Sequence, residues 1–253
     1  MMTHEKFNLI CWLWISVAII TFPIVLKVAQ PYGRHSKKNW GPMINNRLGW
    51  FIMEMPALFI FGYFVISGFN LLNSLVLIAA ILWGMHYIHR VLIFPFQIKT
   101  SGKKIPLIIV IFAIFFNTVN GILNGYWLAH FSSEYQSGVV ANMRLIAGVV
   151  LFLAGYVINK YHDSLLIKLR ATSARGYKIP FGGLFKYISC PNFLGEIISW
   201  LGFFLVTLSL PALSFLIWTL VNLTARAIDH HKWYLKEFPD YPKNRKAIIP
   251  YVL

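Results

Sequence analysis

Residues 48–64 read Leu-Gly-Trp-Phe-Ile-Met-Glu-Met-Pro-Ala-Leu-Phe-Ile-Phe-Gly-Tyr-Phe, an apolar run with one carboxylate, Glu54. The length and composition of this run are typical of a membrane-spanning helix. An ionisable group at membrane depth is costly and usually marks a functional site. A second acid, Glu196, lies in another apolar block, residues 193–228. We therefore expect a membrane protein whose function depends on these two carboxylates.

The composition of the whole chain supports this class. Of the 253 residues, 58% are hydrophobic and only 12% are charged, whereas a soluble domain is about a quarter charged. The net charge of +15 could suggest nucleic acid, but basic residues of membrane proteins collect in cytoplasmic loops. We therefore expect no nucleic-acid partner. Two cysteines, Cys11 and Cys190, give no readable disulfide framework.

The apolar runs predict seven spans. Five lie at about residues 9–28, 49–65, 71–94, 105–128 and 145–159, and two share residues 193–228. Pro211 divides this last block because proline lacks the N–H that a helix interior needs. Lys and Arg gather in alternate loops and in the C-terminal tail, which the positive-inside rule assigns to the cytoplasm. The sequence thus predicts an all-α integral membrane protein, with its N-terminus outside and its C-terminus cytoplasmic.

Several spans carry polar side chains that an apolar helix does not need. Asn117, Asn120 and Asn124 are spaced to share one helical face, where they can join helices or belong to a site. The histidines lack the HExxH spacing of a helical zinc site, so we expect no metal. Neither GxGxxG after a strand nor GxxxxGK[ST] is present. Any nucleotide would therefore bind in a membrane fold.

The basic segment between the fifth and sixth spans is the candidate place for a nucleotide. It is expected to be a cytoplasmic loop that holds Asn159, Asp163, Arg170 and Lys178. Arginine suits phosphate because its planar fork binds two oxygens, and a carboxylate suits ribose hydroxyls. Topological retention is the simpler explanation of any single lysine in this segment.

Residues 176–196, Gly-Tyr-Lys-Ile-Pro-Phe-Gly-Gly-Leu-Phe-Lys-Tyr-Ile-Ser-Cys-Pro-Asn-Phe-Leu-Gly-Glu, resemble the signature of the steroid 5α-reductase family. The resemblance covers nearly the whole chain and implies seven spans, NADPH bound from the cytosolic side, and reduction of the 4,5 double bond of 3-oxo-Δ4-steroids. Shorter matching stretches occur in the same order at residues 32–34, 54–56, 86–90, 124–126, 159–170, 226–234 and 238–250.

The resemblance also implies residue roles. Glu54 and Tyr87 match the pair that contacts the steroid 3-oxo group, while Trp50, Met53 and Arg90 are expected in the substrate pocket. Met53 stands where Gln is common, and Lys103 and Lys178 stand where Arg is common. The expected cofactor-binding residues are Arg34, Lys103, Asn124, Asn159, Asp163, Arg170, Tyr177, Lys178, Asn192, Glu196, Arg226, His230 and Tyr234.

The chemistry of enone reduction agrees with these roles. Hydride arrives at C5, and negative charge develops on the 3-oxo oxygen, where a preorganised donor stabilises the transition state. Tyr87 offers an O–H, and Glu54 can donate a proton or orient Tyr87. A flat apolar substrate is expected to enter from the lipid. Asn192 and Glu196 are expected to serve the cofactor, and the alternative is that they form a helix-capping pair.

Other functions stay open at this point. Relatives of the same fold could reduce a polyprenol or an enoyl chain. A methyltransferase of the isoprenylcysteine type would bind S-adenosylmethionine, and a transporter would use Glu54 and Glu196 as relay groups. We expect a single membrane domain over residues 1–253, with residues 1–94 on the substrate side and 95–253 binding the cofactor. We expect a monomer surrounded by lipid, in a bacterial inner membrane or the endoplasmic reticulum.

Overall fold

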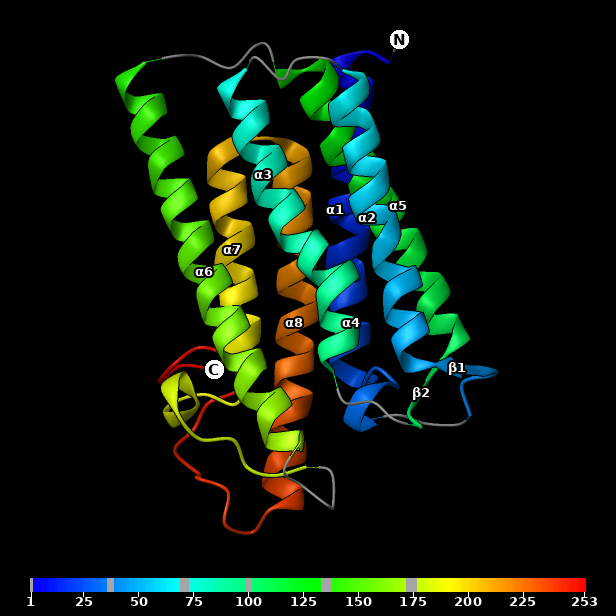
Figure 1. Ribbon diagram of the computed structural model, residues 1–253, viewed down its shortest axis with the longest axis vertical. Helices are drawn as coiled ribbons and strands as arrows, with labels where there is room; N and C mark the ends of the chain where they lie inside the picture. Colours follow the sequence, from blue (N-terminus) through cyan, green and yellow to red (C-terminus); the bar gives the residue numbers. More distant parts are fainter. Residues whose placement is uncertain (1, 36–38, 69–72, 99–101, 133–137, 172–176) are drawn as a thin grey trace.

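The computed structural model describes residues 2–35, 39–68, 73–98, 102–132, 138–171 and 177–253. Its long helices lie side by side, and the two termini lie at opposite ends of this bundle (Figure 1). The helices are α1 (His4–Lys27), α2 (Asn46–Ser67), α3 (Ser74–Ile88), α4 (Phe94–Gln97), α5 (Leu107–His130), α6 (Val139–Ala171), α7 (Pro191–Thr207) and α8 (Leu210–Glu237).

Short elements join the helices at the end of the bundle that holds the C-terminal tail (Figure 1). The strands β1 (Met43–Asn45) and β2 (Lys104–Pro106) pair antiparallel, with Met43 opposite Pro106. A π-helical turn, His89–Ile93, links α3 to α4. Two 3₁₀ turns cover Gly33–His35 and Gly183–Lys186.

Six helical segments of the described chain are long and apolar enough to cross a membrane, and α7, with 17 residues, is a shorter apolar helix. The predicted helical membrane architecture is therefore confirmed. The count of seven spans and their orientation stay predictions. Several of the basic residues behind the orientation, namely Lys37, Lys38, Lys99 and Arg175, lie outside the described residues.

A sharp break separates α7 from α8. Leu208 adopts a left-handed backbone with φ of 44°, and Ser209 caps α8 by accepting a hydrogen bond from the backbone N–H of Ala212 at 3.3 Å. Pro211 lies in the first turn of α8, where its missing N–H costs no helical hydrogen bond. The predicted division of residues 193–228 into two helices is confirmed, and the break falls just before the proline.

The predicted end of the fifth span is wrong. Helix α6 begins before residue 145 and continues well beyond Asn159. Asn159, Asp163 and Arg170 therefore lie on a helix and not in a loop. The predicted span ended too early because residues 160–170 include five charged or histidine side chains, which lower the hydropathy of this part of the helix. Some of these residues, Asp163 and Arg170 among them, line a pocket.

Glycines bring α6 and α7 into close contact. A Cβ on Gly155 would lie 2.4 Å from the backbone nitrogen of Ser199, and one on Gly195 would lie 2.5 Å from that of Asn159. The two backbones can approach this closely only without side chains at these positions. The contact places Asn159 against the turn of α7 that carries Glu196.

Candidate active site

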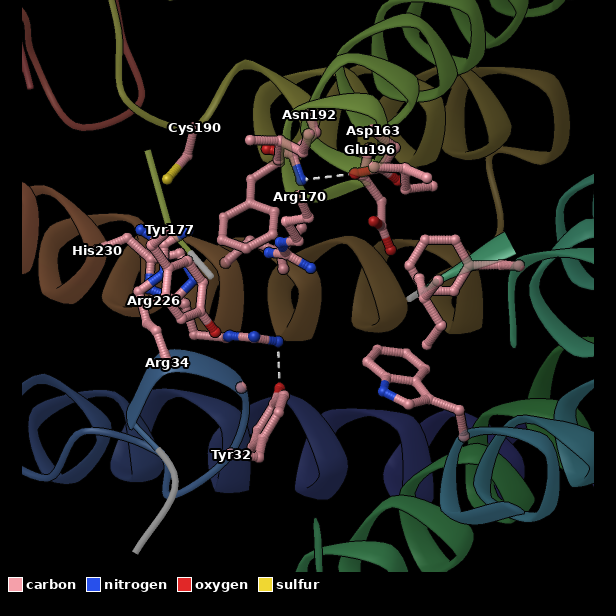
Figure 2. A pocket seen from close by; sticks show the side chains of 18 of the residues that line it. Tyr32, Arg34, Asp163, Arg170, Tyr177, Cys190, Asn192, Glu196, Arg226 and His230 are labelled. Carbon is pink, nitrogen blue, oxygen red and sulfur yellow. Dashed lines mark hydrogen bonds between the residues drawn. The ribbon is translucent and has the colours of Figure 1, made fainter. Parts of the chain in front are cut away.

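A pocket opens at the end of the bundle where α8 ends and α7 begins (Figure 2). Residues from the 28–35 segment, α2, the π-helical turn, α6, α7 and α8 line it. Most of the residues expected at a cofactor are brought together here: Arg34, Lys103, Asp163, Arg170, Tyr177, Asn192, Glu196, Arg226, His230 and Tyr234.

Cations stacked on aromatic rings form one part of the pocket. The Arg34 guanidinium lies 4.5 Å from the centre of the Tyr234 ring and 5.3 Å from that of Tyr177. Lys103 and Arg170 approach the same Tyr177 ring, at 4.9 and 5.5 Å. Aromatic faces attract and orient cations. The Nη1 atom of Arg34 is buried without a hydrogen-bond partner among the described residues, so it can donate to an anion.

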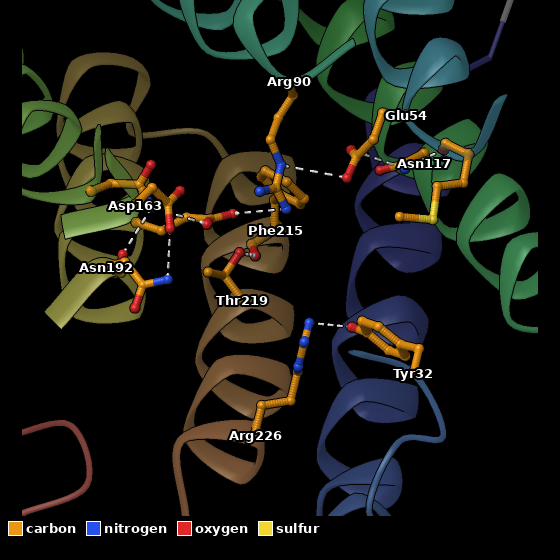
Figure 3. A network of polar contacts seen from close by, with 12 residues as sticks. Tyr32, Glu54, Arg90, Asn117, Asp163, Asn192, Phe215, Thr219 and Arg226 are labelled. Atoms are coloured by element: carbon orange, nitrogen blue, oxygen red, sulfur yellow. Dashed lines mark hydrogen bonds and ion pairs between the residues drawn. The ribbon is translucent and has the colours of Figure 1, made fainter. Parts of the chain in front are cut away.

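Arg226 completes this cationic region opposite Tyr32. Its guanidinium lies 4.2 Å from the centre of the Tyr32 ring and donates a hydrogen bond to the Tyr32 hydroxyl (Figures 2 and 3). Burial raises the pKa of Tyr32, with Arg226 opposing that shift. Tyr32 therefore stays a neutral phenol at physiological pH, and it accepts from a permanent cation.

Amides and carboxylates form the opposite part of the pocket. The Asn192 side chain donates to Oδ1 of Asp163 at 2.9 Å. The Asn159 side chain donates to the backbone carbonyl of Asn192 at 2.9 Å and to Oε2 of Glu196 at 3.4 Å. Since Cys190 is the N-cap residue of α7 and makes no side-chain cap, the capping interpretation of Asn192 and Glu196 is wrong.

Arg90 links the pocket to Glu54. Its Nε lies 3.4 Å from Oε1 of Glu54, and its Nη2 lies 4.0 Å from Oε1 of Glu196 (Figure 3). Its guanidinium also lies 4.9 Å from the centre of the Trp50 ring. Arg90 belongs to the π-helical turn after α3, a geometry that occurs often at functional sites. Arg90 and Trp50 both line the pocket.

Glu54 and Tyr87 lie deeper than the pocket lining. Both are buried, with 7% and 3% of their surface exposed. Asn117 donates to Oε2 of Glu54 at 3.5 Å, and the Tyr87 ring packs 4.9 Å from that of Trp83. Among the described residues, the hydrogen bonds and ion pairs of Glu54 go to Asn117 and Arg90 and not to Tyr87. Direct orientation of Tyr87 by a hydrogen bond from Glu54 is therefore not seen among these contacts.

Besides Glu54 and Tyr87, four more of the expected site residues lie away from the lining. Asn124 is buried in α5 and donates to the carbonyl of Asn120, its neighbour one turn back. Met53 is buried against Ile105 and Val110. Asn159 and Lys178 also do not line the pocket, although Asn159 bonds two residues that do.

Sequence reasoning gave no role to several residues of the pocket. Tyr32 precedes Arg34 in a matched stretch, which was a usable signal. Ser189 bonds His231 and Tyr241, each at 2.7 Å, and nothing in its sequence context indicated this. Cys190 also lines the pocket, and burial raises the pKa of its thiol to about 12.

The fold and the pocket define a helical membrane protein with a strongly cationic, partly acidic cavity at one end. Residues 103–253 match the family model described as 3-oxo-5-alpha-steroid 4-dehydrogenase. The chain belongs to this family, as the stretch 176–196 indicated, and is therefore an oxidoreductase.

Its relatives come from plants and animals. It is 38% identical to "Steroid 5-alpha-reductase DET2" of Arabidopsis thaliana over 236 residues, 90% of each chain. It is 39% identical to "3-oxo-5-alpha-steroid 4-dehydrogenase 2" of Homo sapiens over 234 residues, which cover 90% of this chain and 91% of the human one. With "3-oxo-5-alpha-steroid 4-dehydrogenase 1" of Rattus norvegicus it shares 38% identity over 241 residues, 94% and 92% of the two chains.

Proposed function

We propose that this protein reduces the 4,5 double bond of 3-oxo-Δ4-steroids to 5α-steroids, with NADPH as the hydride donor. The names of its relatives support the reaction class. The observation that carries the proposal is Arg90, which lies between Glu54 in the apolar span and Glu196 in the charged pocket. Arg90 thus connects the buried acid of the apolar span with the charged pocket.

The residues present fit NADPH. Arg34, Lys103, Arg170 and Arg226 would hold its phosphates, since arginine forks suit phosphate oxygens and Nη1 of Arg34 is buried without a partner among the described residues. When bound, NADPH supplies the hydride that is added to C5 of the steroid.

The acidic part of the pocket suits the remaining polar groups of the same cofactor. Asp163 would accept from ribose hydroxyls. Glu196 and Asn192 would bond the nicotinamide amide, because together they offer acceptors and a donor. Asn159 would fix both residues through the bonds it donates.

Glu54 and Tyr87 are proposed to act at the 3-oxo group. Tyr87 holds a proton on its Oη and donates a hydrogen bond to the oxygen on which negative charge develops. Glu54, held by Arg90 and Asn117, sets the charge and orientation around that oxygen. Trp50, Met53 and Arg90 are proposed to border the steroid, which enters from the bilayer. We propose a monomer as the working unit.

The test is product analysis with the purified protein in detergent or lipid. A 3-oxo-Δ4-steroid is mixed with NADPH, NADH or S-adenosylmethionine, and the products are identified by mass spectrometry and by comparison with 5α- and 5β-reduced standards. The proposal expects the 5α product with NADPH, formed far more slowly by the Glu54→Gln variant. Methyl transfer from S-adenosylmethionine, or reduction of a polyprenol or enoyl chain but not of a steroid, would overturn it.

A further inference from the structure

Asn117 differs from the other two asparagines on its face of α5. The side chains of Asn120 and Asn124 donate to carbonyls of their own helix, those of Phe116 and Asn120, at 2.7 and 3.0 Å. Asn117 reaches across to α2 and donates to the carbonyl of Met53 at 2.5 Å. Asn120 also joins two helices, since its Oδ1 accepts from Nε1 of Trp14 on α1 at 3.4 Å. Of the three asparagines, Asn117 is the one whose described hydrogen bonds reach α2, the helix that carries Glu54.

The bond to Met53 fixes which end of the amide faces Glu54. The carbonyl of Met53 can only accept, so the group opposite it must be the NH₂ of Asn117 and not its oxygen. The same Nδ2 lies 3.5 Å from Oε2 of Glu54 (Figure 3). Asn117 thus presents its donor to the backbone and to the carboxylate of two successive residues on α2.

Close packing of α2 on α5 makes this reach possible. One turn along α5 from Asn117, a Cβ on Gly121 would lie 3.2 Å from the carbonyl oxygen of Pro56. A further turn along, a Cβ on Gly125 would lie 3.1 Å from Cα of Phe61. Small residues let two helices approach closely in a membrane protein. The short Asn117 side chain then spans the remaining gap, and it is only 5% exposed.

Arg90 holds the other oxygen of the same carboxylate, Oε1. The two oxygens of Glu54 are therefore taken by donors on two different elements, α5 and the π-helical turn. Two fixed donors leave the carboxylate little rotational freedom about its terminal bond. We propose that Asn117 is a positioning residue that holds Glu54 in its working orientation for steroid reduction. This inference rests on the proposed function.

The test is a double-mutant cycle between Asn117 and Glu54. Asn117→Leu removes both hydrogen bonds at similar volume. It should lower kcat about tenfold to a hundredfold, as expected for one lost hydrogen bond to a charged group, with NADPH affinity unchanged. In a Glu54→Gln background the same change should lower kcat less than about threefold, because groups that act as a unit lose activity non-additively.

Asn120→Leu is the matched control, since Asn120 is also buried in α5 and its described hydrogen bonds go to Phe116 and Trp14. It should lower kcat less than about threefold in either background. If Asn117→Leu does not fold, Asn117→Ser takes its place. Equal losses from Asn117→Leu in both backgrounds would show a merely structural role and overturn the proposal.

A second readout does not depend on activity. The infrared band of the Glu54 carboxyl group is obtained as the difference between the parent protein and Glu54→Gln. Asn117→Leu should shift this band, and Asn120→Leu should leave it in place. If the parent enzyme does not reduce steroids, the proposed function is wrong. The infrared band then still tests whether Asn117 contacts the Glu54 carboxyl group. An unmoved band with Asn117→Leu overturns the positioning role.

Discussion

The Nε atom of Arg90 lies 3.4 Å from Oε1 of Glu54, and this pair joins the π-helical turn to the apolar helix α2. The same guanidinium reaches Glu196 on α7. One cation is therefore shared by two acids that are proposed to serve different ligands. The contact explains how the apolar helix α2 can hold the buried carboxylate of Glu54. A charge that is buried with a partner costs much less free energy than one buried alone.

Replacement of Arg90 should affect both ligands. Arg90→Gln leaves two mostly buried carboxylates without their cation, so we expect a fall in kcat of about tenfold or more, a higher KM for NADPH and a loss of stability of about 3 kcal/mol. Arg90→Lys should restore kcat, the KM for NADPH and the stability only in part, because lysine lacks the planar fork that reaches both acids. Steady-state kinetics and thermal unfolding measure these effects. Arg47→Gln, at an exposed arginine of α2 that stacks on Phe96, is the control. Near-parent kinetics for Arg90→Gln would contradict the linking role.

Glu54→Gln and Tyr87→Phe should each lower kcat about 10²–10³-fold, the usual loss when a donor at a developing oxyanion is removed. NADPH affinity should change little, since neither residue lines the pocket. No direct bond joins the two side chains among their described contacts, so any coupling would arise at the shared carbonyl oxygen. The double variant should then be little worse than the poorer single one. Multiplying losses would show that the two residues act independently.

Arg170→Ala should raise the KM for NADPH about tenfold or more while the KM for the steroid stays near its parent value. The reason is a lost charge-assisted bond to phosphate, and the parent enzyme should therefore prefer NADPH over NADH. Lys168→Ala is the control because Lys168 is an exposed cation on the same helix. Parent-like activity with NADH would argue against a dedicated phosphate site.

Cys190 should resist thiol reagents although it lines the pocket. With a pKa of about 12, roughly one thiol in 10⁴ is ionised at pH 8, and only the thiolate reacts readily. In a Cys11→Ala background, iodoacetamide at pH 8 should label the folded protein far more slowly than the denatured protein, without loss of activity. The labelling rate should rise about tenfold per pH unit as long as the fold persists. Rapid inactivation that NADPH prevents would contradict a buried, neutral thiol.

The sequence predicted the helices and most of the pocket because both leave local signals. A long apolar run predicts a membrane span independently of the elements that pack against it. The stretch 176–196 carries specific residues in a fixed order. The break at Leu208 was also predictable to within a few residues from Pro211, because proline constrains the backbone wherever it occurs.

The parts that the sequence did not reveal depend on contacts between distant elements. The extent of α6 was missed since its last turns face a pocket, and their polar side chains lowered the hydropathy. The pairing of Glu54 with Arg90 was missed because a π-helical turn, which has no simple sequence signature, orients the guanidinium. Whether an asparagine such as Asn117 bonds its own helix or a neighbour depends on how closely that neighbour approaches.

The wall of the pocket near Ser189 and Cys190 has a consequence for biosynthesis. The backbone N–H groups of these residues donate to the carbonyls of Lys246 and Ala247, at 2.8 and 3.1 Å. This wall is thus held by a segment that follows every helix of the described chain. This part of the wall therefore cannot form before the last helix has been synthesised, and the pocket is completed only when the tail that follows α8 is in place.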